Sequence, residues 1–269
     1  MELELKRGGR TARVETLGGE LVSYRDERGL EYIWGGDPAY WPGRNPLLFP
    51  IVGMLKEGKI RFDGREYAME RHGFARRREF TPAARGEDWV RLELRESAET
   101  LALYPYSFRL AVEQRLTDTG FSTAGTVANP GEGPLPFCLG AHTGFRCPLE
   151  AGERFEDYEL VFPERESCPT LLLRDGLLDR PAALPCLEDT DTLPLDYRWF
   201  DALDPLIFEG LRSRSVTLRS RKSGRGVRVS FDGFPMLAFW TMPGKKAPYL
   251  CIEPWHGCAA GTAEGPEFT

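Results

Sequence analysis

The sequence lacks any long apolar segment. No run approaches the roughly 18 consecutive apolar residues that identify a membrane-spanning helix. Residues 1–7 alternate leucine with charged residues and contain no apolar core of the kind that a secretory signal needs. We therefore expect a cytoplasmic protein with no membrane partner.

Patterns typical of metal sites and disulfide scaffolds are also missing. The chain has three histidines in 269 residues, and none has ligand spacing relative to a cysteine. No two cysteines form a CxxC pair, and cysteine is sparse for a disulfide scaffold. The six cysteines are Cys138, Cys147, Cys168, Cys186, Cys251 and Cys258. We expect reduced thiols and no bound metal.

No basic block stands out from the charge distribution. The 35 Lys and Arg residues are scattered among 41 Asp and Glu, so the formal net charge is -6 and nucleic acid is not an expected partner. Apolar residues make up 41% and charged residues 28%, which is typical of an ordinary globular protein. Since no low-complexity linker divides the chain, we expect one domain over residues 1–269.

What the sequence does contain is a succession of short segments in which apolar residues alternate with polar ones. The clearest are 3–5, 60–62, 90–94, 108–112 and 227–231. Asp63-Gly64 predicts a hairpin turn, and residues 223–226 predict a similar connection. The 29 Gly and 21 Pro favour turns over long helices. This pattern predicts an all-β protein, a large antiparallel β-sandwich that binds a ligand on its concave face.

Only short helices are expected. Ser97 is a good N-cap for a helical turn over residues 97–101, and a second turn is predicted near residues 201–203. Residues 164–196 are rich in Pro, Asp, Leu and Glu and show no clear period. This segment predicts a long loop over the surface.

A carboxylate interrupts an apolar strand pattern near the C-terminal end of the sequence. Glu253 lies among Tyr249, Leu250, Cys251, Ile252 and Trp255. Dehydration in such surroundings raises the pKa of a carboxyl group and makes it a better proton acceptor near neutral pH. Pro254 favours an extended backbone and is expected to end the strand, which would leave Glu253 at a strand end beside a cleft. The alternative is a carboxylate that pairs with an arginine for structural reasons.

A histidine among small residues is the second candidate for chemistry. His142 follows Gly140-Ala141 and precedes Thr143-Gly144, which leaves room for a ligand to approach its ring. With an ordinary pKa of about 6.5, a histidine holds or releases a proton at neutral pH, so His142 is a natural partner for Glu253. A purely structural role, in which the ring donates a hydrogen bond, is the alternative.

Two stiff segments carry arginine, asparagine and histidine. The first surrounds Arg44-Asn45, and the second runs from Arg71 through His72 to Arg76. Donors that are held in place before a ligand arrives suit the recognition of hydroxyl groups. Alternatively, Arg44 and Arg76 are paired with neighbouring carboxylates.

Four motifs together resemble the aldose 1-epimerase (galactose mutarotase-like) family, and most closely its bacterial LacX-like branch. They are Arg44-Asn45-Pro46 with Phe49-Pro50-Ile51-Val52-Gly53, Arg71-His72-Gly73-Phe74-Ala75-Arg76, Gly140-Ala141-His142, and Cys251-Ile252-Glu253-Pro254-Trp255. Their order is that of the family, over roughly residues 1–260. The resemblance implies a β-supersandwich with a sugar on its concave face, and an isomerase that interconverts the α and β anomers of an aldose without a cofactor.

The resemblance also assigns roles to individual residues. It implies that Glu253 is the base and that His142 donates a proton to the ring oxygen. It further implies that His72 and Arg44 bind the sugar. Asp204 matches a family aspartate on a short motif, and Arg76 matches the pattern of the branch without a transferable role. One departure is Thr143, where the branch commonly has proline after the histidine.

Three other functions stay open from the sequence. A hexose 6-phosphate 1-epimerase would need at least two arginines at the cleft mouth, and the sequence offers Arg44, Arg71, Arg76, Arg77 and Arg78. A non-catalytic carbohydrate-binding module would use the same cleft without accelerating a reaction. A cysteine-dependent hydrolase would use Cys138 or Cys251 together with a nearby histidine.

Overall fold

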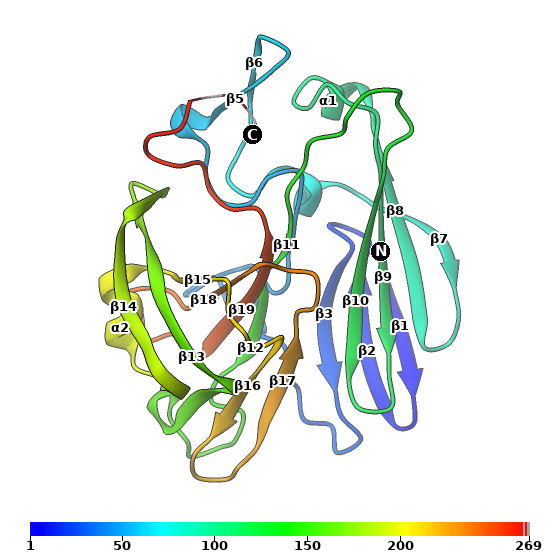
Figure 1. Ribbon diagram of the computed structural model, residues 1–269. Coiled ribbons are helices and arrows are strands. Elements are labelled where there is room, and N and C mark those ends of the chain that lie inside the picture. The colour runs from blue at the N-terminus through cyan, green and yellow to red at the C-terminus, as the bar shows by residue number, and fades with distance from the viewer. Residues whose placement is uncertain (266, 268–269) are drawn as a thin grey trace.

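The computed structural model describes residues 1–265 and 267, and it is an antiparallel β-sandwich with few helical residues (Figure 1). This confirms the fold class predicted from the alternating pattern. Within the described residues, no helix is both long and apolar enough to cross a membrane.

Two sheets come from the N-terminal half of the chain and contact each other through β1, β2 and β9. The first consists of β1 (Glu2–Arg7), β2 (Arg10–Glu15) and β3 (Glu20–Arg25). The second has the order β10 (Phe121–Ala128), β9 (Arg109–Leu116), β8 (Trp89–Arg95) and β7 (Thr81–Arg85). Val90, Leu92 and Leu94 of β8 are buried, as the alternation predicts.

The largest sheet carries the candidate site and, within the described residues, has ten strands. Its order is β17 (Gly226–Ser230), β16 (Ser215–Ser220), β13 (Tyr158–Arg174), β15 (Leu206–Glu209), β18 (Met236–Trp240), β19 (Tyr249–His256), β11 (Leu139–Ala141) and β4 (Leu47–Leu48). In addition, β12 (Thr143–Arg146) pairs with β19, and β14 (Leu177–Pro194) pairs with β13. In Figure 1, β11, β12 and β19 run through the middle of the molecule.

The predicted turns and caps are confirmed. Asp63-Gly64 joins β5 (Lys59–Phe62) to β6 (Arg65–Ala68), and residues 221–225 join β16 to β17. Helix α1 (Ala98–Leu101) begins after Ser97, whose hydroxyl accepts a hydrogen bond from the backbone N–H of Thr100. Helix α2 (Tyr197–Leu203) covers the second predicted position. The short 3-10 helices are η1 (Lys56–Gly58), η2 (Ala75–Arg77) and η3 (Phe155–Asp157).

The expectation of a surface loop over residues 164–196 is wrong. Nearly all of this segment belongs to the long hairpin of β13 and β14, which turns at Asp175-Gly176. The pairing shifts register four times between Val161 and Leu172, and each shift moves the following side chains relative to their partners. These irregularities break the two-residue period, so the sequence pattern gives no strand signal here.

Candidate active site

Glu253 lies in the middle of β19, not at its end. The strand continues through Pro254 to His256, which contradicts the expectation that the proline ends it. On one side β18 pairs with β19 without a break, through Ala238 opposite Glu253 and Leu237 opposite Pro254. On the other side the pairing is interrupted between β11 and β12. A proline, which has no amide proton to donate, is tolerated where a ladder is already interrupted on one side.

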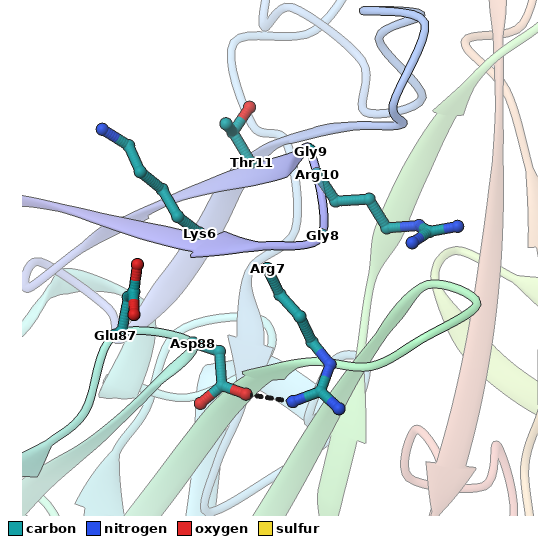
Figure 2. Close-up of a pocket in the computed structure, with 8 residues that line it drawn as sticks. All are labelled: Lys6, Arg7, Gly8, Gly9, Arg10, Thr11, Glu87 and Asp88. Atoms are coloured by element: carbon teal, nitrogen blue, oxygen red, sulfur yellow. Dashed lines mark hydrogen bonds and ion pairs between the residues drawn. The ribbon is translucent and has the colours of Figure 1, made fainter.

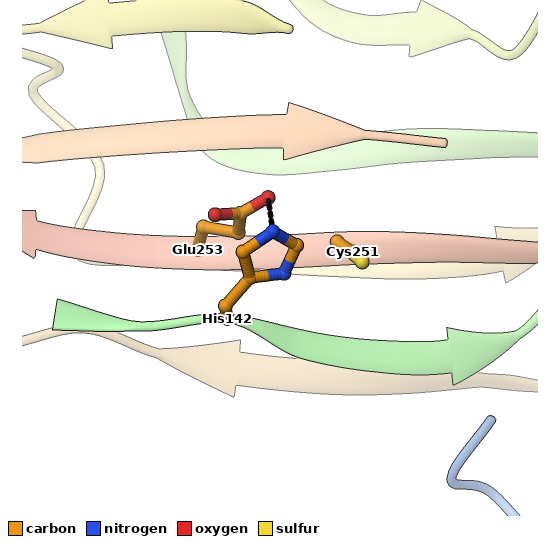
Figure 3. Close-up of side chains that lie close together, drawn as sticks. All are labelled: His142, Cys251 and Glu253. Atoms are coloured by element: carbon orange, nitrogen blue, oxygen red, sulfur yellow. Dashed lines mark ion pairs between the residues drawn. The ribbon is translucent and has the colours of Figure 1, made fainter. Parts of the chain in front are cut away.

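His142 occupies that interruption and lies opposite Glu253. Before the interruption Gly140 is opposite Trp255, and after it Thr143 is opposite Ile252. The two pairings share one register, and this register places His142 opposite Glu253. Side chains that are directly opposite on neighbouring strands lie close together on one face. The distance from His142 Nε2 to Glu253 Oε1 is 3.4 Å (Figure 3). The structure therefore brings together the two residues that the sequence singled out for acid–base chemistry.

Burial controls the protonation of both groups. Glu253 is 2% exposed and His142 is 8% exposed. Loss of solvation raises the pKa of Glu253 well above its usual value, an increase that the N–H of Trp255 opposes and Asp204 reinforces. Burial lowers the pKa of His142 to about 3. Burial therefore favours the neutral ring, and the expectation that His142 titrates near neutral pH is wrong.

The Arg44-Asn45-Pro46 segment holds His142 in place through the backbone. The His142 N–H donates to Pro46 O at 3.1 Å, and the Gly144 N–H donates to Arg44 O at 2.8 Å. The Thr143 hydroxyl bonds to Asn45 Oδ1 at 2.6 Å. The motif therefore extends the sheet beside His142.

The side chain of Arg44 does not line the pocket. Its Nε donates to Gly35 O at 3.1 Å, and its Nη1 lies 3.4 Å from Glu15 Oε1. The structure therefore gives Arg44 the paired, structural position that the sequence left as the alternative.

His72 approaches His142 from a separate loop. Their ring centroids are 5.7 Å apart, and His72 Nδ1 accepts a hydrogen bond from the Gly53 N–H at 3.0 Å. Since Nδ1 is the acceptor, the neutral ring carries its hydrogen on Nε2. Burial and the charges of Arg76 and Arg71, together with His142, lower the pKa of His72 well below its usual value.

The backbone of this loop is tightly constrained. His72 has a φ of +65°, and a Cβ on Gly73 would lie 2.2 Å from Phe49 O. Only glycine allows such a close approach of the loop to the segment after β4. The loop geometry therefore fixes the position of His72 in the pocket.

Glu253, His142 and His72 line one cavity of about 540 Å³. Its aromatic side chains are Trp41, Trp240 and Trp255, and its charged side chains and histidines are Arg71, His72, Arg76, His142, Asp204 and Glu253. Trp41 stacks on His142, with ring centroids 4.7 Å apart and an interplanar angle of 26°. Leu173, Gly176 and Leu178 of the β13–β14 hairpin form part of the wall, so the segment expected to be a loop helps to shape the cavity.

Two arginines of the pocket have no carboxylate partner among the described residues. Arg71 Nη2 lies 2.7 Å from Met54 Sδ, and Arg76 Nη2 donates to Arg71 O at 2.7 Å. Their neighbours differ, because Arg77 pairs with Glu70 and Arg78 pairs with Glu99. The pocket thus contains two guanidinium groups without an ion-pair partner among the described residues.

Asp204 follows α2 and also faces the pocket. It has a φ of +62° and accepts a hydrogen bond from Trp240 Nε1 at 2.8 Å. The motif that suggested this residue is short, but the structure places Asp204 in the same cavity as Glu253.

A third buried side chain lies beside the acid–base pair. Donor atoms of His142, Cys251 and Glu253 lie within 4.8 Å of one another, a cluster that sequence spacing did not reveal (Figure 3). Cys251 is fully buried and does not line the cavity, and burial raises its pKa well above the usual value. A thiol that stays protonated is a poor metal ligand and a poor nucleophile. Burial also raises the pKa of Cys138 to about 11, so neither cysteine favours a hydrolase.

A separate hollow of about 540 Å³ lies at the turn between β1 and β2 (Figure 2). Its lining is mostly charged or glycine, and Arg7 pairs with Asp88 and Asp118. Histidine and cysteine are not among the residues that line it. Its basic side chains Lys6, Arg7 and Arg10 are paired with carboxylates, so it offers no acid–base pair like that of His142 and Glu253 among its lining residues.

The sequence reasoning missed several residues of the cavity. Trp41 and Trp240 flank His142, but neither had a signal beyond the presence of an aromatic residue. The wall residues of the hairpin were missed because the register shifts hid the strands. Trp255 was part of the Glu253 motif, yet its side chain had no assigned role.

Comparison with known proteins gives this geometry a context. The two forms of protein LacX from Lactococcus lactis subsp. lactis, plasmid and chromosomal, are each 42% identical to this chain over 273 residues, covering 98% of this chain and 91% of the relative. A galactose mutarotase related enzyme from Lactobacillus acidophilus superposes with a TM-score of 0.95 at 28% identity, covering 100% of this chain and 89% of that one. A galactose mutarotase-like protein from Lactobacillus casei superposes with a TM-score of 0.89 at 29% identity, covering 99% of this chain and 91% of that one.

The family comparison agrees with the four motifs. The sequence model described as aldose 1-epimerase matches residues 1–263, which include every residue of the cavity. With this match and the 42% identical relatives, the resemblance inferred from the motifs is confirmed, and the chain belongs to the aldose 1-epimerase family.

Proposed function

We propose that this protein is an aldose 1-epimerase, an isomerase that interconverts the α and β anomers of a hexose by opening and closing the ring. The observation that carries the proposal is the buried contact of 3.4 Å between His142 Nε2 and Glu253 Oε1 in the cavity. A volume of about 540 Å³ is in the usual range for a small-molecule site. The substrate is accordingly a small sugar.

Anomer exchange needs a base and an acid at neighbouring oxygens. Glu253 removes the proton of the C1 hydroxyl while His142 delivers a proton to the ring oxygen, so the C1–O5 bond breaks and the aldehyde forms. Rotation about C1–C2 presents the other face of the carbonyl, and the reverse transfers close the ring. Each positioned group contributes roughly 10²–10⁴-fold, and no step requires a cofactor.

The shifted pKa values suit a pair that shares one proton. Burial favours the neutral carboxyl and the neutral ring. The ion pair of carboxylate and imidazolium contains the same number of protons, and transfer across the contact interconverts the two states. Sugar hydroxyls that replace lost hydration stabilise the ion pair, so binding itself charges the base and the acid.

The remaining groups of the cavity orient the sugar. His72 donates from Nε2, because its Nδ1 already accepts a hydrogen bond from Gly53. Asp204 accepts hydrogen bonds from sugar hydroxyls beside Trp240. Trp41 and Trp240 offer aromatic surface to the apolar faces of a pyranose. Arg76 supplies a donor, whereas Arg44 has no part in this proposal because its side chain lies outside the cavity.

A hexose 6-phosphate is a second candidate substrate. The observation in its favour is that Arg71 and Arg76 line the cavity without carboxylate partners among the described residues. Guanidinium groups bind phosphate oxygens through paired, charge-assisted hydrogen bonds. Both candidates use the same acid–base pair and differ only in the group attached to C6.

A substrate panel tests the proposal. We would measure α-to-β exchange by polarimetry or NMR for glucose, galactose, a pentose and the two hexose 6-phosphates, each corrected for the spontaneous rate. Acceleration of at least one sugar supports an epimerase, and the preferred sugar identifies the substrate class. Sugar binding by calorimetry without acceleration of any of them would instead indicate a non-catalytic carbohydrate-binding protein.

A further inference from the structure

Two buried polar atoms beside each other in the cavity lack hydrogen-bond partners among the described residues. They are Glu253 Oε2, an acceptor, and Trp255 Nε1, a donor. Both residues belong to β19 and line the same cavity. Because they are two positions apart in a strand, their side chains leave the sheet on the same face. Buried polar atoms are nearly always paired, so an unpaired donor next to an unpaired acceptor indicates a hydrogen bond formed in another state of the site.

Packing holds the indole of Trp255 in place. Trp255 is 5% exposed and lies opposite Gly140 of β11. A Cβ at Gly140 would lie 3.0 Å from Trp255 Cδ1, the carbon bonded to Nε1, and 3.2 Å from Leu48 Cδ1. The missing side chain at Gly140 therefore makes room for the edge of the ring that carries the N–H.

Several groups around Glu253 already have other partners among the described residues. His142 contacts Oε1, the other oxygen of the carboxyl group. Trp240 donates to Asp204, whose charge raises the pKa of Glu253. Cys251 is a buried thiol, and Arg71, His72 and Arg76 line the same cavity. The Trp255 N–H acts in the opposite direction to burial and lowers the pKa of Glu253. Trp255 is the hydrogen-bond donor that acts on the pKa of Glu253, and this points to it as the partner of the unpaired Oε2.

We propose that Trp255 is a positioning residue whose indole N–H donates a hydrogen bond to Glu253 Oε2 when this carboxyl group is ionised. The bond holds the carboxylate with Oε1 toward His142 and the reacting oxygens of the sugar. It also replaces part of the hydration that a buried carboxylate loses, since a hydrogen bond to the charged form favours that form. The catalytic meaning rests on the proposed epimerase function, but the hydrogen bond is a property of the protein without sugar.

The first test uses the resting protein and needs no activity. The indole ¹⁵N–¹H signal of Trp255, assigned by its absence in Trp255→Phe, is followed with pH in the wild type and in Glu253→Gln. We expect the indole proton to move downfield in one titration step in the wild type and to stay in place in Glu253→Gln. A signal that does not move, or that moves equally in both proteins, overturns the inference.

The second test is the pH dependence of anomer exchange. In Trp255→Phe the acid limb of kcat/KM should shift upward by about one pH unit, with near wild-type rates above the limb, because the charged base has lost its donor. A decrease of kcat/KM by the same factor at every pH would mean that the indole only fills space, and this result would overturn the proposal. Trp89→Phe is the control, because Trp89 lies under Arg115 outside the cavity and its loss should leave the profile unchanged.

The two tests separate the failure of the inference from that of the proposed function. If Trp255→Phe does not fold, benzothienylalanine at position 255 keeps the shape of the ring and removes only the N–H. If the wild type accelerates no sugar, the epimerase proposal fails while the indole titration still decides whether Trp255 bonds Glu253.

Discussion

His142, between β11 and β12, lies opposite Glu253 of β19, with His142 Nε2 at 3.4 Å from Glu253 Oε1. The pairing register of the sheet sets this relationship, and the two residues are buried. Acid–base groups held in this way need little reorganisation when a sugar binds. The preorganisation has an energetic cost, because both groups lose hydration, and this cost gives the first prediction.

Glu253→Gln should stabilise the folded protein at neutral pH. The folded pKa of Glu253 is raised above the ordinary value of 4.5, so the stability of the wild type falls as pH rises from that value to the folded pKa. The variant lacks this loss, which amounts to about 1.4 kcal/mol for each unit by which the pKa is raised. Urea unfolding of both proteins from pH 4 to pH 8 measures the difference.

His142 provides an internal check on that experiment. The folded pKa of His142, about 3, lies below the ordinary value of 6.5. The free energy of unfolding therefore decreases as pH falls from 6.5 toward 3, and this decrease occurs in both proteins. The effect of His142 should therefore largely cancel when the free energy of unfolding of Glu253→Gln is compared with that of the wild type. A stability difference that does not change with pH would mean that Glu253 has an ordinary pKa in the folded state.

Arg71→Gln and Arg76→Gln should impair a phosphorylated sugar more than the free sugar if the substrate carries a phosphate. Each loss removes a charge-assisted hydrogen bond, and we expect kcat/KM for the 6-phosphate to fall by about tenfold or more. Arg77→Gln is the matched control, because Arg77 pairs with Glu70 and does not line the cavity. Equal effects of all three variants would show that general charge, and not a phosphate contact, is responsible.

Arg44→Met should lower stability without changing sugar affinity. The guanidinium of Arg44 bonds Gly35 O and lies near Glu15, so its loss is expected to cost about 1 kcal/mol in the free energy of unfolding. Denaturant melts and KM for the preferred sugar measure the two effects separately. A several-fold increase in KM with unchanged stability would restore the sugar contact that the motif resemblance implied.

Much of the fold could be predicted because local rules and tertiary structure agree. The Asp63-Gly64 turn, the Ser97 cap and the alternation in β8 follow from short-range preferences that the structure keeps. The β13–β14 hairpin could not be predicted, since its register shifts erase the period on which strand prediction depends. Pro254 was misleading because a local rule for strand ends ignores which side of the strand is paired.

The candidate site shows the same division. Glu253 and His142 were recognisable because a carboxylate in an apolar strand and a histidine among small residues are unusual. That they face each other depends on the register of β11, β12 and β19, which one sequence does not reveal. Arg44 was assigned to the sugar from its motif, whereas its backbone, not its side chain, supports His142 through residue 144.

The anomer exchange rate of Glu253→Gln, measured with its preferred sugar beside the wild type and His142→Asn, tests the central claim most directly. Glutamine keeps the shape of the side chain but cannot accept the proton. Exchange should therefore fall to the spontaneous rate in Glu253→Gln, while calorimetry still detects sugar binding close to that of the wild type. His142→Asn should lose roughly 10²–10⁴-fold. Near wild-type exchange in Glu253→Gln would contradict the account.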